Sequence, residues 1–504
     1  MELIKELPAL GRDLGPGLIL IGLTSIAAII VGCLFEEWEA LPWMAAATIS
    51  LCGIGLLLRF LPKTSKVPRT STSIAATALV WVIVGICGSF PFLFTGMPFL
   101  DAAFESMSAW TGTGFSIAEN IEAWPKTLLF WRSFMQWVGG LGIVAFTLTV
   151  ATRSGLVTRG LYNSESGGQA FMPSVIATAF QMWKIYAVLT LAAILVILLT
   201  GVGLWDAVNL ALCGIATGGM SIYAAGISHF QNFALEMVLI PIMIAGAVPF
   251  RLYYLTYAKR SIKEFFRDRV LWAMILAFAF VSAVLVIDLT ISNGIPLSQA
   301  FREGLFMAGT AISSTGFQNT EFAGWGIAPI LFLGIFMLMG GAQGSTAGGI
   351  KIDRIRVMGE TLVWWFKRAV LSPKAVVLMR HNGKAVKESH AEALVSKSLL
   401  LILCYLLLLA GTLIILLHDP YFASNVAGTI FDVCSCVGNN GASAGMISAI
   451  MPDYSKVLLF IVMWAARLEI IPVMILFWES FADSVGNQSL KDTSDIHEKY
   501  IQRT

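Results

Sequence analysis

Long apolar runs separated by short polar segments dominate this chain. A helix that crosses a bilayer needs about 20 mostly apolar residues, and ten runs are close to that length. They lie at 15–34, 42–61, 74–97, 126–151, 180–202, 233–257, 270–290, 326–346, 395–417 and 456–480. Four shorter apolar stretches lie at 101–110, 205–216, 297–312 and 422–437. Because such lengths are typical of buried or re-entrant helices, the pattern predicts an all-α polytopic membrane protein.

From residue 71 onward one unit recurs four times: a long run, a short helix, a polar segment with glycine, and a second long run. Long internal periods define a fold, and this one favours a pseudo-fourfold arrangement of the units around one pore. The predicted division is a two-span domain at 1–70, pore repeats at 71–160, 161–262, 263–385 and 386–485, and a tail at 486–504. In the third repeat the second helix is expected to be interrupted, because a glycine-rich run falls within it.

Composition agrees with a lipid-facing surface. Hydrophobic residues make up 57% of the 504 residues and charged residues 13%, about half the ~25% found in soluble domains. The net charge of +2 gives no reason to expect a nucleic-acid partner. The seven cysteines include no Cys-x-x-Cys pair, so neither a disulfide framework nor a zinc site is expected.

Basic residues gather in alternate connections between the runs. They are Lys63, Lys66 and Arg69; Arg153 and Arg159; Lys259, Arg260, Lys263, Arg267 and Arg269; and Lys351, Arg354, Arg356, Lys367, Arg368, Lys374 and Arg380. By the positive-inside rule these connections are cytoplasmic. Both termini are then expected in the cytoplasm, and all four short helices on the outer side.

A polar segment with glycine follows each short helix. The four segments are 111–116 (Thr-Gly-Thr-Gly-Phe-Ser), 216–221 (Ala-Thr-Gly-Gly-Met-Ser), 313–318 (Ser-Ser-Thr-Gly-Phe-Gln) and 438–443 (Gly-Asn-Asn-Gly-Ala-Ser). Non-helical backbone at membrane depth is tolerated where it is buried in protein or lines a cavity. Glycine permits the positive φ that turns successive carbonyls toward one axis, and carbonyl rings can replace the hydration shell of K⁺. The preceding helix would aim its negative C-terminal end at the same axis.

Each segment taken alone could instead be an ordinary turn or a contact between helices through small residues. Four such segments in matching places of four matching units favour a carbonyl-lined cation path. Three further motifs accompany them, at 136–142 (Gln-Trp-Val-Gly-Gly-Leu-Gly), 340–351 (Gly-Gly-Ala-Gln-Gly-Ser-Thr-Ala-Gly-Gly-Ile-Lys) and 463–469 (Met-Trp-Ala-Ala-Arg-Leu-Glu). Together these residues resemble the Trk/Ktr/HKT superfamily of K⁺ transporters, and within it the TrkH type of bacterial uptake subunit. The likeness covers nearly the whole chain, including two N-terminal spans that Ktr-type subunits lack.

The resemblance implies a K⁺ selectivity filter with Gly114, Gly219, Gly316 and Gly441 as its matching glycines. The candidate filter residues are Thr111, Gly112, Thr113 and Gly114; Ala216, Thr217, Gly218 and Gly219; Ser314, Thr315 and Gly316; and Asn439, Asn440 and Gly441. Glycine rather than serine at position 114 favours K⁺. Gly112 and Ala442 stand where the family commonly has threonine and proline, and a Na⁺ or mixed Na⁺/K⁺ pathway is the alternative.

The run at 340–349 interrupts the eighth span. Glycine costs about 1 kcal/mol per residue in a helix interior relative to alanine. The run is therefore a kink, a site of close packing or, as the resemblance implies, a gate loop below the filter. The candidate gate residues are Gly340, Gly341, Gly344, Ser345, Thr346, Gly348, Gly349 and Arg467.

Each charged residue within the apolar regions could have either of two roles. Arg467 either pairs with a buried carboxylate such as Glu469, or lies at the pore below the filter, where the resemblance puts it and where it would oppose cation passage. Asp101, Glu105 and Asp206 are expected to cap the short helices at their N-termini, and the alternative is that they also attract cations to the outer mouth of the pore.

Catalysis is not expected, since no Ser/His or paired-carboxylate constellation lies at membrane depth. A purely structural scaffold would not need four polar loops. The run at 340–349 lacks the Gly-Lys-Ser/Thr ending of a P-loop, so no cofactor is expected in this chain and K⁺ is the transported ion.

The resemblance implies a homodimer in the bacterial inner membrane, regulated by a cytosolic ring of TrkA-type subunits that bind NAD(H) and ATP. The basic stretches 259–269 and 351–387 offer a docking surface, although ordinary topology explains much of their charge.

Overall fold

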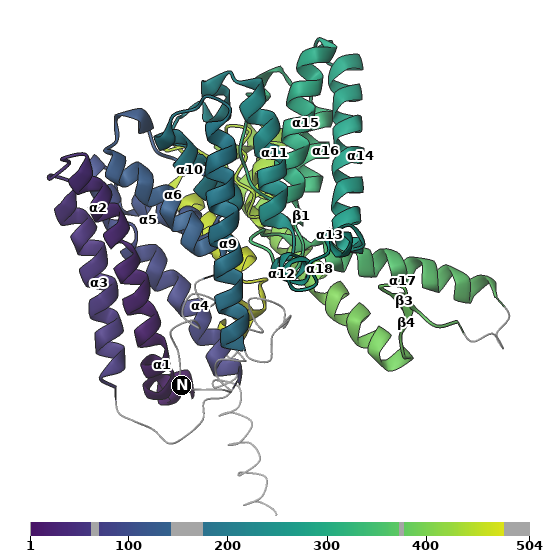
Figure 1. Ribbon diagram of the computed structural model, residues 1–504, viewed down its shortest axis with the longest axis horizontal. Helices are drawn as coiled ribbons and strands as arrows, with labels where there is room; N and C mark the ends of the chain where they lie inside the picture. The colour runs from purple at the N-terminus through teal and green to yellow at the C-terminus, as the bar shows by residue number, and fades with distance from the viewer. Residues whose placement is uncertain (1, 62–69, 143–174, 372–376, 478–504) are drawn as a thin grey trace, which may run out of the picture.

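The computed structural model describes residues 2–61, 70–142, 175–371 and 377–477. The described chain is a helical bundle with an arm that extends to one side (Figure 1). At the N-terminal flank lie α1 (Glu2–Thr24), α2 (Ile26–Leu34) and α3 (Leu41–Arg59). α1 packs along α3 at Gly15 and Gly55, each of which faces backbone of the other helix. Small residues at such crossings let two helix backbones approach closely.

Each of the four repeats contains a first helix, a pore helix and a second helix. The first helices are α4 (Thr70–Cys87), α9 (Val175–Leu198), α14 (Arg269–Ile291) and α18 (Glu388–Leu417). The pore helices are α5 (Phe99–Thr111), α10 (Leu204–Ile215), α15 (Leu297–Ser313) and α20 (Val426–Val437), and the second helices are α6 (Lys126–Gly140), α11 (Phe233–Ala247), α16 (Ile327–Met337) and α21 (Asp453–Arg467). Connecting these are η1 (Phe90–Thr95), η2 (Ile121–Ala123), η3 (Gly226–Phe230), η4 (Phe322–Gly324) and α19 (Pro420–Ala423). The four short helices predicted from the apolar pattern are confirmed.

The pore helices pack in a closed cycle. Each contacts the second helix of its own repeat and that of the repeat before it: α10 lies against α6 and α11, α15 against α11 and α16, and α20 against α16 and α21. α5 lies against α6 and α21, which joins the fourth repeat to the first. In α5 every residue from Asp101 to Thr111 is buried, as expected for a helix surrounded by others. The predicted pseudo-fourfold fold is confirmed.

The second helices end at corresponding places, just beyond their contacts with the pore helices. α11 turns by 88° into α12 (Phe250–Ala258), and α21 turns by 116° into a helix that begins at Ile471. The expectation of unbroken spans at 233–257 and 456–480 was therefore wrong. Pro249 disfavours helical backbone at the residue before it, and Glu469 and Ile470 have φ of +56° and +66°, which a right-handed helix cannot contain.

In the third repeat a loop replaces the continuation of the second helix, as predicted. Its ends pair as two short parallel strands, β1 (Met339–Gly340) and β2 (Ile350–Lys351). A Cβ at Gly340 would overlap the carbonyl oxygen of Gly348, so only glycine lets the two ends of the loop lie this close. We call residues 338–351 the gate loop, after the gating role that the sequence predicts for residues 340–349.

The chain leaves the bundle after the gate loop. α17 (Ile352–Val370), a hairpin of β3 (Arg380–His381) and β4 (Lys384–Ala385), and the start of α18 form an arm that extends sideways (Figure 1). α13 (Ile262–Phe266) connects α12 to α14 near the base of this arm. α17 carries exposed Leu362, Trp365 and Phe366 as well as basic residues.

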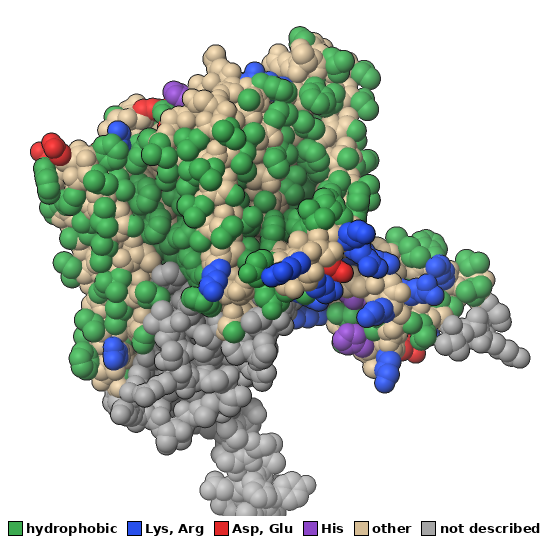
Figure 2. Space-filling model, viewed as in Figure 1, with side chains coloured by type: hydrophobic (Ala, Val, Ile, Leu, Met, Phe, Trp, Pro, Cys, Tyr) green, Lys and Arg blue, Asp and Glu red, His purple; other side chains and the backbone are tan. Residues whose placement is uncertain are grey.

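The body of the bundle presents an apolar surface, and Lys and Arg side chains gather at one end of it, over α12, α13 and the arm (Figure 2). Among the described residues, six helices are long and apolar enough to cross a membrane, or eight if each of the two bent pairs counts as one span. The prediction of ten spans counted α6 and α16, whose described helices hold only 15 and 11 residues. The predicted tail at 486–504, the boundary between 160 and 161, and the basic residues at 63–69, 153 and 159 lie outside the described residues.

Candidate functional site

The four glycine segments adopt one common backbone conformation. The fourth residue of each six-residue segment is a glycine with positive φ: +92° at Gly114, +75° at Gly219, +94° at Gly316 and +98° at Gly441. Positive φ also occurs two residues earlier, at Gly112, Thr217, Ser314 and Asn439. The residue between them does not share it in any repeat. This alternation of backbone handedness can turn successive carbonyls toward the same side.

The amides of these segments point back to the pore helices. Thr113, Gly218, Thr315 and Asn440 each donate their backbone N–H to the carbonyl five residues earlier, at distances of 3.0, 2.9, 3.0 and 2.9 Å. In two repeats a hydroxyl extends the pattern, since Thr310 Oγ1 accepts from the Gly316 amide and Ser435 Oγ from the Gly441 amide. The end of each pore helix thus binds one or two amides of its own segment, so these amides are directed at the pore helix.

The four glycines close a ring. A Cβ at Gly114 would overlap the carbonyl oxygen of Gly218, and one at Gly219 that of Thr315. A Cβ at Gly316 would overlap the oxygen of Asn440, and one at Gly441 that of Thr113, which returns to the first repeat. Each glycine therefore lies against the residue that precedes the matching glycine of the next repeat, and no other amino acid fits there without displacing a carbonyl.

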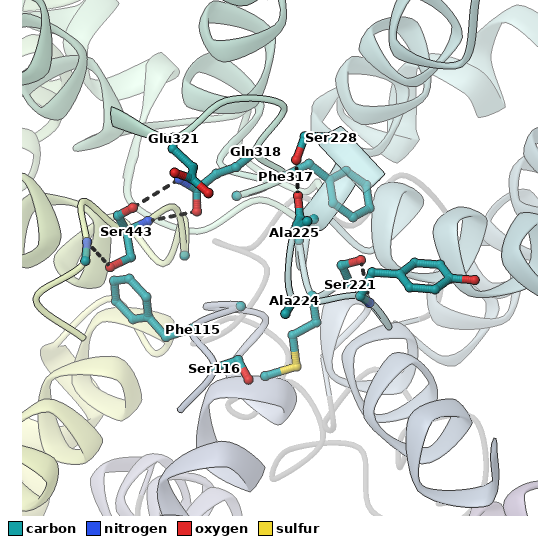
Figure 3. Close-up of a pocket in the computed structure, with 18 of the residues that line it drawn as sticks. Phe115, Ser116, Ser221, Ala224, Ala225, Ser228, Phe317, Gln318, Glu321 and Ser443 are labelled. Atoms are coloured by element: carbon teal, nitrogen blue, oxygen red, sulfur yellow. Dashed lines mark hydrogen bonds between the residues drawn. The ribbon is translucent and has the colours of Figure 1, made fainter. Parts of the chain in front are cut away.

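A cavity of about 470 Å³ lies on one side of this ring, toward the residues that follow the four glycines. Its lining includes all four glycines together with residues that follow them, among them Ser116, Ser221, Gln318 and Ser443. Figure 3 shows these four side chains arranged around the cavity, with Gln318 and Ser443 joined by hydrogen bonds. We call this cavity the vestibule.

Two buried carboxylates hold the first and fourth segments through hydrogen bonds. Glu105 in α5 accepts from the Ser116 hydroxyl at 2.9 Å and the Ile117 amide at 3.0 Å, and it forms an ion pair with Arg132 at 2.7 Å. The expectation that Glu105 caps its helix was wrong: it lies in the middle of α5 and faces the segment after the turn. Asp432 in α20 is the counterpart, accepting from the Ser443 hydroxyl and the amides of residues 444, 446 and 447.

Sequence reasoning missed Asp432 and Arg132, although one signal was available. Glu105 and Asp432 each lie nine positions before the matching glycine, and a serine follows that glycine by two positions in both repeats. A carboxylate buried at the same register of two repeats needs a partner there.

Side chains also link neighbouring segments. Gln136 Nε2 in α6 donates to the Gly218 carbonyl at 2.6 Å, and its Oε1 accepts from the Met220 amide. Arg132 Nη1 donates to the Ser221 carbonyl at 3.0 Å. The first repeat is thereby fixed to the second, as Gln318 fixes the third to the fourth.

The gate loop lies beneath the segments. Thr346 Oγ1 is 3.1 Å from Thr217 Oγ1 and donates to the carbonyls of Ile215 and Gly246. A Cβ at Gly348 would lie 2.5 Å from the Cβ of Asn439. The structure thus brings the predicted gate residues into contact with two of the four candidate filter segments, on the side away from the vestibule.

Arg467 joins the same region. Its Nη1 donates to the Thr346 carbonyl at 2.8 Å, and its Nη2 donates to the carbonyls of Gly139 and Gly140 at 2.7 and 2.8 Å. It also lies over the ring of Trp81. Glu469, the carboxylate suggested as its partner, instead forms an ion pair with Arg354 at the start of α17.

Two other predicted acidic residues lie in the first turns of their pore helices, as expected, but their carboxylates have side-chain partners. Asp101 accepts from Lys456 at 2.6 Å. Asp206 accepts from the Tyr223 hydroxyl at 3.0 Å, beside the vestibule. Burial and the neighbouring Asp206 carboxylate raise the pKa of Tyr223 to about 12, so this phenol stays a neutral donor.

A buried ring of backbone carbonyls, helix C-termini around one axis and an apolar exterior define a multi-pass membrane protein with a path for cations. Comparison with known proteins agrees: the TrkH family model, described as cation transport protein, matches residues 43–484. The chain belongs to the TrkH family of cation transport proteins.

Individual relatives match along nearly their full lengths. A cation transporter of Methanocaldococcus jannaschii is 32% identical, with 94% of this chain and 96% of the relative covered. The Trk system potassium uptake protein TrkH of Halomonas elongata is 28% identical, over 93% and 98% of the two chains. The crystal structure of the potassium transporter TrkH from Vibrio parahaemolyticus superposes with a TM-score of 0.81 at 26% identity, covering 93% of this chain and 98% of that one.

The glycine ring generates a direct prediction. Gly316→Ala should lower cation flux in proteoliposomes by at least ~10-fold, because the methyl group must displace the Asn440 carbonyl from its place in the ring. Gly445→Ala is the matched control, since Gly445 has a similar φ of +96° but no atom near the added Cβ. It should retain nearly all flux. Equal losses in the two variants would show that backbone strain alone, not the approach to the neighbouring carbonyl, explains the effect.

Proposed function

We propose that this protein is the transmembrane subunit of a potassium uptake system and conducts K⁺ through a gated pore along the axis of its four repeats. The observation that carries the proposal is the closed ring in which each matching glycine lies against a carbonyl of the next repeat. The potassium transport named for the relatives from Halomonas and Vibrio supports the choice of ion.

In this proposal the carbonyls of the four segments replace the hydration shell of K⁺. The filter residues are those predicted: 111–114, 216–219, 314–316 and 439–441. Four pore helices end at the segments, and their negative C-terminal ends favour a cation there. The vestibule is the outer mouth, so the basic end of the bundle faces the cytoplasm, as do both termini.

The gate is formed by the predicted loop residues and Arg467. The loop occupies the space below the filter, and its contacts with Thr217 and Asn439 support an obstructing role. The guanidinium of Arg467 adds a positive charge at membrane depth, which raises the barrier to a cation. Opening requires Thr346 to leave its four polar partners. They are Thr217, Arg467 and the carbonyls of Ile215 and Gly246.

The cytoplasmic side offers surfaces for partners. We propose that the protein acts as a homodimer, supported by the arm, whose exposed Leu362, Trp365 and Phe366 are unusual on a helix so rich in charge. A cytosolic nucleotide-binding ring of the TrkA type would dock on the basic stretches 259–269 and 351–387. The relatives' description as Trk system proteins supports a multi-component assembly.

The choice of ion can be tested by reconstituting the purified chain in liposomes and measuring the flux of K⁺, Rb⁺, Na⁺ and Li⁺ side by side. K⁺ and Rb⁺ should pass faster than Na⁺ and Li⁺, because a ring of carbonyls compensates the dehydration of the larger ions better. Equal K⁺ and Na⁺ flux would contradict selectivity for K⁺ over Na⁺ and would favour a mixed Na⁺/K⁺ pathway.

Replacing Arg467 tests its role at the gate. Arg467→Ala should raise cation flux several-fold, since it removes both a positive charge from the path and the bond that holds the Thr346 carbonyl. Arg467→Lys, which keeps the charge but not the fork of donors, should show a smaller increase. Lower flux from an alanine variant of normal yield would contradict the assignment.

Shortening the gate loop tests the obstruction itself. Deletion of residues 344–346 should increase flux in the absence of any cytosolic partner, because the loop would no longer reach Thr217. The matched control is Gly359→Ala in α17, where the added Cβ meets no atom. Unchanged flux in the deletion variant would exclude a gating role for the loop.

A further inference from the structure

A second cavity, of about 340 Å³, lies at the basic end of the bundle. Four parts of the chain line it: the start of α12, the junction of α13 and α14, Gln343 of the gate loop with Asp353 of α17, and Asn382 in the turn between β3 and β4. Figure 2 shows Lys and Arg side chains collected over this end. Three of the lining residues are arginines, namely Arg251, Arg267 and Arg269.

Two carboxylates also line this cavity, and both accept backbone hydrogen bonds. Asp268 caps α14, accepting from the Val270 amide at 2.8 Å and the Leu271 amide at 3.2 Å. Asp353 accepts from the Gln343 amide at 2.8 Å. Within the described residues none of the three arginines forms an ion pair with a carboxylate, whereas Lys259 close by pairs with Glu264 at 3.1 Å. The three guanidinium groups outnumber the two carboxylates of the lining, and guanidinium groups that form no ion pair can donate hydrogen bonds to a phosphate group.

We propose that this cavity binds the phosphate group of a phosphate ester, held by Arg251, Arg267 and Arg269. The surroundings favour a phospholipid of the cytoplasmic leaflet as its source. α14, which begins at Arg269, is apolar and long enough to span a membrane. The exposed Phe266 directly precedes Arg267, and the exposed Trp272 follows Arg269 by three positions. Basic pockets at this depth suit anionic lipid headgroups.

The site also touches the gate loop. The amide of Phe250, which precedes Arg251, donates to the Gly344 carbonyl at 3.0 Å, and Gln343 itself lines the cavity. The loop is therefore held at two points beside this cavity, at the Gly344 carbonyl by Phe250 and at the Gln343 amide by Asp353. A phosphate bound here would lie close to both. The inference is independent of ion selectivity, since binding is measured without transport.

The test compares two triple variants of the full-length chain in detergent. Arg251→Gln, Arg267→Gln and Arg269→Gln together remove the proposed ligands. Lys259→Gln, Arg260→Gln and Lys263→Gln together remove the same charge from the neighbouring surface, outside the lining of the cavity. Retention of phosphatidylglycerol, cardiolipin and phosphatidylcholine is measured by native mass spectrometry, and binding of inorganic phosphate and ATP by thermal stabilisation.

The wild type should retain the anionic lipids, and the cavity variant should lose ~10-fold more of this binding than the control variant, because paired guanidinium contacts exceed the effect of general surface charge. Loss of ATP or phosphate binding alone, in the cavity variant only, would support the same site with a soluble ligand. Equal losses in both variants, or no phosphate ligand bound by the wild type, would overturn the proposal. Arg251→Gln alone, which should show an intermediate loss, serves if the triple variant does not fold.

Discussion

The architecture depends on the approach of four glycines to four carbonyls. At each of these positions the space that a Cβ would need holds the backbone oxygen of the next repeat. The contact runs from the first repeat to the second, third and fourth and back to the first, so a shift in one segment is passed to its neighbours. Everything around the ring serves to hold it: pore helices satisfy the amides, second helices fill the gaps between pore helices, and Glu105 and Asp432 fix the backbone that follows.

The four repeats are alike where the ring needs them to be and differ elsewhere. Repeats one and four carry a carboxylate behind the segment, whereas the corresponding positions in repeats two and three are Leu210 and Met307. In the second repeat Gln136 of α6 holds the segment instead, and in the third Gln318 of the segment itself bonds Ser443 of the fourth repeat. Pseudo-symmetry of this kind lets one polar path be supported by different side chains, provided that each buried polar group finds a partner.

The ends of the second helices join the ring to the basic end of the bundle. Where α6 and α11 end, their last turns leave carbonyls that need donors. The gate loop and Arg467 supply several of them, bonding the carbonyls of Gly246, Ala247, Gly139 and Gly140. The loop then continues directly into α17, whose Arg354 pairs with Glu469 at the break in α21. A displacement of the arm would therefore act on the loop and on this break together.

Much of the fold can be predicted from the amino-acid sequence. The apolar runs, the four short helices, their glycine segments and the interruption at 340–349 follow from local composition, since length, hydropathy and glycine content act along the chain. The partners of buried charges cannot be predicted in this way. Glu105 bonds the backbone after its segment rather than capping its helix, Glu469 pairs with Arg354 rather than with Arg467, and Asp432 binds Ser443 and amides that follow it. Pro249 is a local signal for the break after Ala247, whereas apolar residues continue through the break after Arg467, where packing beneath the ring decides that the helix turns. Which carbonyl each glycine meets is likewise a property of the closed cycle, because the contacting residues lie about a hundred positions or more apart and meet only once four repeats surround one axis.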